Sequence, residues 1–276
     1  MKFKLYDKIN DKKKLVYLVI IIIILILSYI CFFNYNRGLL IEQEQAENYY
    51  TDCNVAGITL YGQLYTYLPD DMDEDVTSAD DIAYYVEEAE KADNIKAIIM
   101  EIDAYGGSPV ASEEVANHLK HATKPLVTMI RDVGLSGAYW AATGADIIFA
   151  SKNSDIGSIG VTMSYVDNVQ KNIKEGLTYN QISSGKFKDY GSPDKMLSYE
   201  EKQLFQRDVD ILHNNFIEAI AENRGMTIEE VIKLADGSSM TGDFALEAGL
   251  IDRIGGIYEV KDYIKDLINE DVEICW

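Results

Sequence analysis

Residues 96–109 read KAIIMEIDAYGGSP, and residues 125–140 read PLVTMIRDVGLSGAYW. Each stretch opens with an apolar run that is typical of a buried strand, Lys96–Ile102 in the first and Pro125–Ile130 in the second. Each run ends in a glycine-containing turn that leads directly into a segment with helical periodicity. Strands that alternate with helices in this way predict an α/β domain with a mainly parallel sheet.

The alternation continues on both sides of these two stretches. Further strands are expected at Val55–Leu64, Asp146–Ala150 and Ile159–Met163, and helices at Asp80–Ala92, Ser112–His121 and Gly137–Gly144. From Tyr199 to about Leu267 the pattern is mostly helical. Because no repeat or proline-rich linker interrupts the chain, we predict one domain over residues 51–267, followed by a tail over residues 268–276.

The N-terminal part has the pattern of a membrane anchor. Residues 15–33, LVYLVIIIIILILSYICFF, are 19 residues without a charge, which is enough for a helix to cross a bilayer. The preceding residues 1–14 carry six Lys and two Asp, so the positive-inside rule predicts a cytoplasmic N-terminus and an extracytoplasmic domain. A cleaved signal peptide is the alternative, but no small-x-small cleavage site follows closely. Residues 34–50 are interpreted as a juxtamembrane linker or short helix.

The composition excludes several classes of protein. The 276 residues carry a formal charge of −21, and removing the +4 of residues 1–14 leaves −25 for the rest, which argues against a nucleic-acid binder. Three Cys exclude a disulfide-framework fold. Cys53 and Cys275 lie near the two ends of the expected domain, and whether they pair is left open. The acidic run over residues 70–75 is interpreted as a solvated loop rather than a cation site.

The usual cofactor and metal motifs are missing from the sequence. It contains no G-x-G-x-x-G, no phosphate-binding G-x-x-x-x-G-K-[ST], no C-x-x-C and no H-E-x-x-H, so no cofactor is expected. His118 and His121 are three apart on an expected surface helix, and without a third ligand we expect no metal site. A Ser-His-Asp triad would have to use one of these or His213, and no G-x-S-x-G elbow supports it.

The turns at the strand ends are the chemically informative feature. Asp103–Pro109 and Asp132–Ala138 each follow a strand and open onto a helix, where unpaired backbone N–H groups can stabilise an oxyanion. Ser136 in the second turn is either a nucleophile or a helix N-cap. A third turn, Asp155–Val161, and a lysine-bearing loop, Ser183–Tyr190, complete the set.

In this order, the four segments resemble the signal peptide peptidase A family of membrane serine peptidases, the protease IV type, in its short single-domain form. Asp103–Ser108 corresponds to the family's D-S-P-G-G turn, and Asp132–Trp140 to its nucleophile segment. Ile156–Val161 corresponds to its G-S-I-G-V turn, and Ser184–Asp189 to its S-G-x-x-K-D loop. Further matches are Arg224–Met226, Ala235–Gly237 and Gly249–Asp252, so the resemblance covers about Ala56–Tyr263.

The resemblance implies a fold of the Clp-protease/crotonase type and a Ser-Lys dyad. Ser136 would be the nucleophile, Lys188 the general base, and Ser158 the hydroxyl that orients the lysine amine. The N–H groups of Gly107 and Gly137 would form the oxyanion hole. An exposed lysine is charged and accepts no proton, so Lys188 must be desolvated to act as a base.

Some residues depart from the family pattern. Leu135 and Ala138 replace small residues of the nucleophile segment, and Ala104-Tyr105 replaces Ser-Pro in the oxyanion turn. No catalytic group is lost. We expect Tyr105 and Leu135 to crowd the substrate cleft and to change which side chains it accepts. Lys186, two residues before Lys188, is interpreted as a solvated loop charge.

The activity implied is that of a membrane-anchored serine endopeptidase on the extracytoplasmic side, which cleaves apolar, extended peptides such as remnant signal peptides. The family's homo-oligomeric assembly is expected as well. A catalytically silent membrane scaffold of the same fold is the alternative. Acyl-CoA chemistry on a crotonase-like fold is disfavoured, because the domain is strongly negative and the coenzyme is a polyanion.

Overall fold

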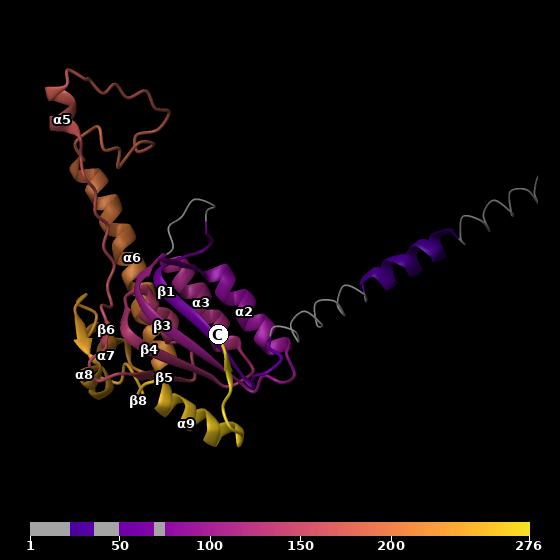
Figure 1. The fold of residues 1–276 in the computed structure, drawn as a ribbon. Coiled ribbons are helices and arrows are strands. Elements are labelled where there is room, and N and C mark those ends of the chain that lie inside the picture. The colour runs from indigo at the N-terminus through magenta and orange to yellow at the C-terminus, as the bar shows by residue number, and fades with distance from the viewer. Residues whose placement is uncertain (1–22, 36–49, 69–74) are drawn as a thin grey trace, which may run out of the picture.

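The computed structural model describes residues 23–35, 50–68 and 75–276. Within them, a nine-stranded sheet runs in the order β2-β1-β3-β4-β5-β8, while β6 pairs with β4 and β7, and β9 pairs with β1 (Figure 1). Every pairing is parallel except that of β6 with β7, which confirms the predicted α/β fold with a mainly parallel sheet. The strands are β1 (Val55–Tyr65), β2 (Val76–Ser78), β3 (Ala97–Gly107), β4 (Leu126–Leu135), β5 (Ile147–Ala150), β6 (Asp155–Gly157), β7 (Ser239–Thr241), β8 (Arg253–Ile254) and β9 (Ile274–Cys275).

Helices cover the sheet on both faces. Alternate residues of β3, among them Ile98 and Met100, pack into the larger core against α2, α3 and α4, whereas Ile99 packs with Val260 and Ile264 of α9 on the other face. Both faces of β3 are therefore apolar, as expected for a central strand of a parallel sheet. The helices are α2 (Ala79–Lys91), α3 (Pro109–His121), α4 (Gly137–Ala142), α5 (Val169–Lys174), α6 (Tyr199–Arg224), α7 (Ile228–Ile232), α8 (Gly242–Glu247) and α9 (Ile257–Ile268).

Three strand predictions differ from the structure. β3 and β4 are longer than expected, because they continue through the glycine segments as far as Gly107 and Leu135. The strand expected at Ile159–Met163 is wrong, and the paired segment is Asp155–Gly157 instead. Ser158, with φ at 50°, ends the extended strand directly after Gly157, although Ser158 and Ile159 still share backbone hydrogen bonds with Ser238 and Gly237. The Clp-protease/crotonase type of superhelix stays a prediction.

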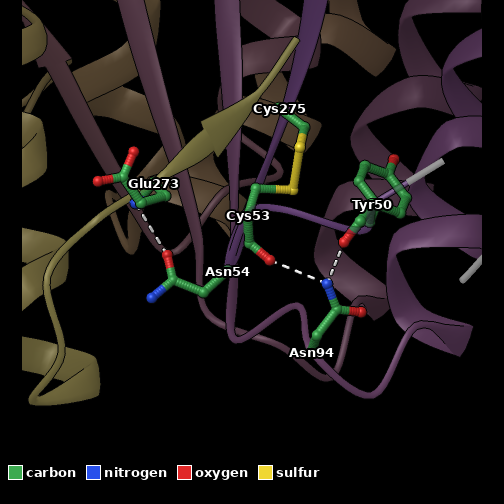
Figure 2. The surroundings of a disulfide bond; sticks show 6 residues. All are labelled: Tyr50, Cys53, Asn54, Asn94, Glu273 and Cys275. Atoms are coloured by element: carbon green, nitrogen blue, oxygen red, sulfur yellow. Dashed lines mark hydrogen bonds between the residues drawn. A yellow bond between two sulfur atoms is a disulfide. The ribbon is translucent and has the colours of Figure 1, made fainter. Parts of the chain in front are cut away.

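The two ends of the domain are joined by a disulfide bond. Cys53 and Cys275 are bonded with their Cα atoms 5.7 Å apart, so the pairing that the sequence left open is present (Figure 2). Beside it, the Asn94 amide donates to the carbonyls of Tyr50 and Cys53, and the Glu273 N–H donates to Asn54 Oδ1 at 3.0 Å (Figure 2). The tail therefore folds back onto β1, where β9 continues the sheet.

The expected membrane span is described only in part. Residues 23–35 are helical with exposed side chains, and residues 15–22 lie outside the described part. In the described ranges no helix has both the length and the apolar content that a bilayer crossing needs. Most of the linker over residues 34–50 and most of the acidic run over residues 70–75 also lie outside the described part. The anchor stays a prediction.

One segment projects from the body of the domain. Figure 1 shows α6, a helix of 26 residues, leading away from the sheet toward α5, which lies at its remote end. We call residues 163–198, which include α5, the arm. Its large apolar side chains are exposed, including Val166 (82 %) and Ile182 (100 %), in contrast to the buried residues of the sheet.

Candidate active site

Ser136 lies at the junction of β4 and α4 in a strained conformation. Its φ of 50° and ψ of −125° are rare for a residue with a side chain, and such outliers occur preferentially at functional sites. Its N–H donates to the Gly157 carbonyl at 2.7 Å, which fixes the turn against β6. Although Ser136 is at the N-cap position of α4, its side chain makes no capping hydrogen bond. The hydroxyl is therefore not used to stabilise the helix.

The backbone of Gly106 and Gly107 packs directly against this junction. A Cβ on Gly106 would lie 2.9 Å from the Gly137 nitrogen and 3.0 Å from the Ser136 Cβ. A Cβ on Gly107 would lie 2.0 Å from the Leu64 carbonyl oxygen, and one on Gly137 would lie 3.2 Å from the Gly107 nitrogen. The backbones of Gly107 and Gly137 thus meet beside Ser136, which is the placement that an oxyanion hole requires.

Ser158 lies on the same cleft and is held by the loop at residues 235–238. Its φ is also 50°, and its N–H donates to the Ser238 carbonyl at 3.0 Å. Its hydroxyl donates to the Gly237 carbonyl at 3.1 Å. In a single chain this hydroxyl therefore contacts a backbone oxygen and not a lysine amine.

A cleft of about 550 Å³ joins these groups. One part of its wall is apolar, where Tyr105 and Val161 are accessible and the buried rings of Trp140 and Phe216 stack behind the surface with centroids 5.0 Å apart. Tyr105 lines the cleft as expected, whereas Leu135 is not one of the lining residues. The lining residues are Tyr105, Gly107, Pro109, Ser136, Gly137, Trp140, Ser158, Gly160, Val161, Thr162, His213, Phe216, Ala235, Asp236 and Gly237.

Lys188 is not one of the residues that line this cleft. Its side chain is exposed in the arm, where the neighbouring Lys186 pairs with Glu200 at 2.8 Å. Figure 1 shows the segment between α5 and α6 at the end of α6 that is remote from the sheet. The structure therefore brings Ser136, Gly107 and Gly137 together with Ser158, and it does not bring Lys188 to them within one chain.

The residue after Lys188 is the centre of a polar network that the sequence did not reveal. Asp189 accepts hydrogen bonds from the Tyr179 hydroxyl at 2.6 Å and from Lys195 at 3.0 Å, and Lys195 also pairs with Glu201 at 2.7 Å. The hydrogen bond from Tyr179 lowers the pKa of Asp189, and the one from Lys195 lowers the pKa of Glu201. The S-x-x-E spacing of Ser198 and Glu201 marks the start of α6, but no local pattern singled out Lys195.

Two further polar residues of the cleft were not predicted as site residues. Asp236 lines it, and hydrogen bonds from the Ser238 hydroxyl and N–H lower the pKa of this carboxyl. His213 also lines it, with Nε2 buried and without a hydrogen-bond partner. Across the described ranges, no group of three or more His, Cys, Asp or Glu is placed to hold a metal ion, and His121 Nδ1 lies 2.8 Å from the Asn117 carbonyl.

Comparison with known proteins decides the family. The model of peptidase family S49 matches residues 118–271, more than half of the chain, and this match includes Ser136, Ser158 and Lys188. The chain belongs to peptidase family S49. The predicted resemblance to signal peptide peptidase A and protease IV is thereby confirmed at the level of the family.

Curated relatives of this S49 chain carry protease names. A putative protease of Methanocaldococcus jannaschii is 32 % identical over 68 % of this chain and 62 % of its own length. A putative signal peptide peptidase SppA of Enterococcus faecium is 33 % identical over 62 % of this chain and 51 % of its own length. Protease 4 of Haemophilus influenzae is 26 % identical over 82 % of this chain and 37 % of its own length. The chain thus spans less than two thirds of the length of these relatives.

Solved structures give a more distant likeness to the S49 chain. A variant of 1510-N, a membrane-bound stomatin-specific protease, has a TM-score of 0.47 at 19 % identity and covers 75 % of this chain and 82 % of its own. A variant of ClpP1 from Listeria monocytogenes has a TM-score of 0.48 at 13 % identity, over 74 % of this chain and 92 % of its own. Neither likeness is close enough to assign a role to a residue.

Proposed function

We propose that this chain is a serine endopeptidase in which Ser136 is the nucleophile and Lys188 the general base, acting on apolar, extended peptides. The observation that carries the proposal is the Ser136 junction, where a strained serine with no capping hydrogen bond lies beside the backbones of Gly107 and Gly137. Membership of a peptidase family supports the same chemistry.

The reaction would proceed through an acyl-enzyme. Ser136 Oγ attacks the carbonyl carbon of the peptide bond while the neutral amine of Lys188 takes its proton. The negative charge that develops on the carbonyl oxygen is stabilised by the N–H groups of Gly107 and Gly137. The lysine then returns the proton to the leaving amine, and a water molecule, activated by the same lysine, releases the acyl group from Ser136.

Lys188 needs a second copy of the chain to fulfil this role. An exposed lysine is charged at neutral pH, and the described residues that line the cleft include no Lys or Arg. We infer that the arm of one copy places Lys188 in the cleft of another, where burial favours the neutral amine and Ser158 orients it. The exposed apolar side chains of the arm, such as Leu177 and Ile182, would be covered in the same contact. This supports a homo-oligomer.

The substrate class is inferred from the cleft wall. Beyond Gly157 the chain leaves the sheet, and Gly160, Val161 and Thr162 line the cleft, where an extended peptide can pair with their backbone. The accessible Tyr105 and Val161 of the same wall suit apolar side chains. Remnant signal peptides fit this description, and a relative is named a putative signal peptide peptidase.

The location is also part of the proposal. The uncharged run over residues 15–33 would anchor the domain on the extracytoplasmic side of the membrane. The Cys53–Cys275 disulfide supports an oxidising compartment, because such bonds are rare in the cytosol of most cells.

The test uses the full chain in mild detergent and an apolar synthetic signal peptide, with cleavage followed by mass spectrometry. We expect cleavage by the wild type and none by Ser136→Ala or Lys188→Ala. Mixing the two inactive variants before assembly should restore part of the activity, because some clefts then combine an intact serine with an intact lysine. If both variants assemble and no mixture of them cleaves the peptide, the proposed placement of Lys188 in the cleft of another copy is wrong.

A silent scaffold of the same fold is the second candidate, and the position of Lys188 outside its own cleft favours it. In that case the assembled wild type binds the peptide and leaves it intact. Mass spectrometry of the same incubations separates the two functions.

A further inference from the structure

Asp236 is the one Asp, Glu, Lys or Arg among the described residues that line the Ser136 cleft. Tyr105 and His213 also line it, and His213 Nε2 is enclosed and contacts no partner. The adjoining loop residues Gly237 and Ser238 carry no charge. Asp236 therefore supplies the one carboxylate among the described residues of the cleft wall.

This carboxylate is held in place before any ligand arrives. Its Oδ1 accepts from the Ser238 N–H at 2.9 Å and from the Ser238 hydroxyl at 2.6 Å. The loop that carries it is fixed to the cleft wall, because the Gly237 N–H donates to the Ile159 carbonyl at 3.2 Å and the Ser158 hydroxyl donates to the Gly237 carbonyl. Hydrogen bonds from Ser238 also hold the pKa of this carboxyl below its usual range.

Asp236 has no cationic partner in the described part of the chain. None of the ion pairs formed there includes it, although other exposed carboxylates such as Glu200, Glu222 and Asp271 are paired with lysines. A fixed, ionised and unpaired carboxylate on the wall of a cleft is suited to a cation that comes from outside the chain.

The apolar wall completes the recognition of a long basic side chain. Tyr105, which is exposed, and Val161, which is half-buried, line the cleft that Asp236 also lines, so an aliphatic stem can pack on them while its charged end reaches the carboxylate. We propose that the cleft selects peptides that carry a lysine or arginine close to the bond to be cleaved, with Asp236 as the specificity-determining residue. This inference rests on the proposed function only in assuming that the cleft binds peptides.

The experiment measures binding, so that it does not depend on turnover. The full chain carrying Ser136→Ala is titrated into fluorescent apolar peptides. Each peptide carries Lys, norleucine or Glu at one position, and this position is varied from peptide to peptide. At one position the Lys peptide should bind about two- to five-fold more tightly than the norleucine peptide, the range expected for an exposed ion pair. The Glu peptide should bind more weakly than both, and added salt should reduce the differences.

The decisive variant is Asp236→Asn, which should bring the ratio of Lys to norleucine affinity close to one. Asp243→Asn is the matched control, because Asp243 is an exposed carboxylate that does not line the cleft, and it should leave the ratio unchanged. The inference is overturned if Lys and norleucine peptides bind equally at every position, or if Asp236→Asn keeps the preference.

Two further outcomes separate this inference from the proposed catalysis. In the first outcome, Asp236 pairs with Lys188 of a second copy instead of with the peptide. Asp236→Asn then shifts the pH profile for cleavage of the norleucine peptide, and the binding preference for Lys persists. This result overturns the inference. In the second outcome, the chain with Ser136 intact cleaves no peptide, yet the binding preference for Lys is present and depends on Asp236. The proposed catalysis then fails, and the inference stands.

Discussion

The Ser136 junction and the Lys188 arm differ in what holds them. At the junction, added Cβ atoms on Gly107 and Gly137 would come within 2.0 and 2.2 Å of neighbouring atoms, so the backbone is closely packed. In the arm, Gly176 and Gly185 have nothing within 4 Å of such an atom, and close packing is found where Gly191 and Tyr190 meet Phe205 of α6. One chain therefore fixes the nucleophile and the oxyanion donors by its own packing, whereas the segment that carries the proposed base packs mainly along α6.

The largest effect should come from the end of the arm. Lys188→Ala should lower kcat/KM for an apolar peptide by about 10²- to 10⁴-fold, the range for loss of a general base, without changing the Tm. The Tm is spared because the exposed side chain contributes little to folding. Lys186→Ala, two residues away, is the control and should lose only surface contacts, the ion pair with Glu200 and the cation–π contact with Phe187. The reverse result would assign the base to Lys186 instead.

Removing the disulfide should affect the body of the domain and leave the arm unchanged. Cys53 and Cys275 are 222 residues apart, so breaking their bond releases a long loop in the unfolded chain. Cys53→Ser with Cys275→Ser should reduce the free energy of unfolding by about 2–4 kcal/mol in a denaturant titration. Cys31→Ser removes a free, exposed thiol and should cause no change. Equal unfolding curves for the chain with the disulfide bond and the chain without it would show that other contacts already hold the two ends together.

Glycine substitutions test the difference in packing directly. Gly107→Ala should cost about 1–3 kcal/mol of unfolding free energy, because its Cβ would overlap the Leu64 carbonyl oxygen and β1 or β3 must shift. Gly185→Ala in the arm should change stability by no more than about 0.5 kcal/mol, since its Cβ would meet open space. If both substitutions cost the same, the arm is packed as closely as the junction in the assembled protein.

Local patterns in the sequence predicted the junction well and the arm poorly. The buried strands and the glycine segments follow from apolar periodicity and from turn residues that act within a few positions, whereas the nucleophile role of Ser136 is implied by the family resemblance. The position of Lys188 relative to Ser136 depends on α6 and on contacts outside one chain, which no local pattern encodes. The Ile159–Met163 error has a different cause, because the left-handed backbone of Ser158 ends the strand before this segment, and no local pattern reveals that conformation. The role of Asp236 depends on a loop that meets Ser158 only after folding.

The smallest expected effect is a pH-dependent loosening of the arm. The pKa values of Asp189 and Glu201 are lowered by hydrogen bonds from Tyr179 and Lys195, so their ionised forms stabilise the folded arm. That stabilisation is complete above the ordinary carboxyl pKa near 4 and is lost as the pH falls through the lowered values. Hydrogen-exchange protection factors, which correct for intrinsic rates, should therefore fall in residues 163–198 below about pH 4 while those of β3 persist.

Lys195→Met should reduce the arm's protection already at pH 6 and remove part of the change on acidification, because the two carboxylates then lose their shared cation while Asp189 keeps the hydrogen bond from Tyr179. Lys171→Met, on the exposed surface of α5, should behave like the wild type. Equal loss of protection in the arm and in β3 on acidification would mean that the two regions unfold as one unit. The arm would then be stabilised by the body of the domain, and the contrast between a self-contained junction and a dependent arm would no longer hold.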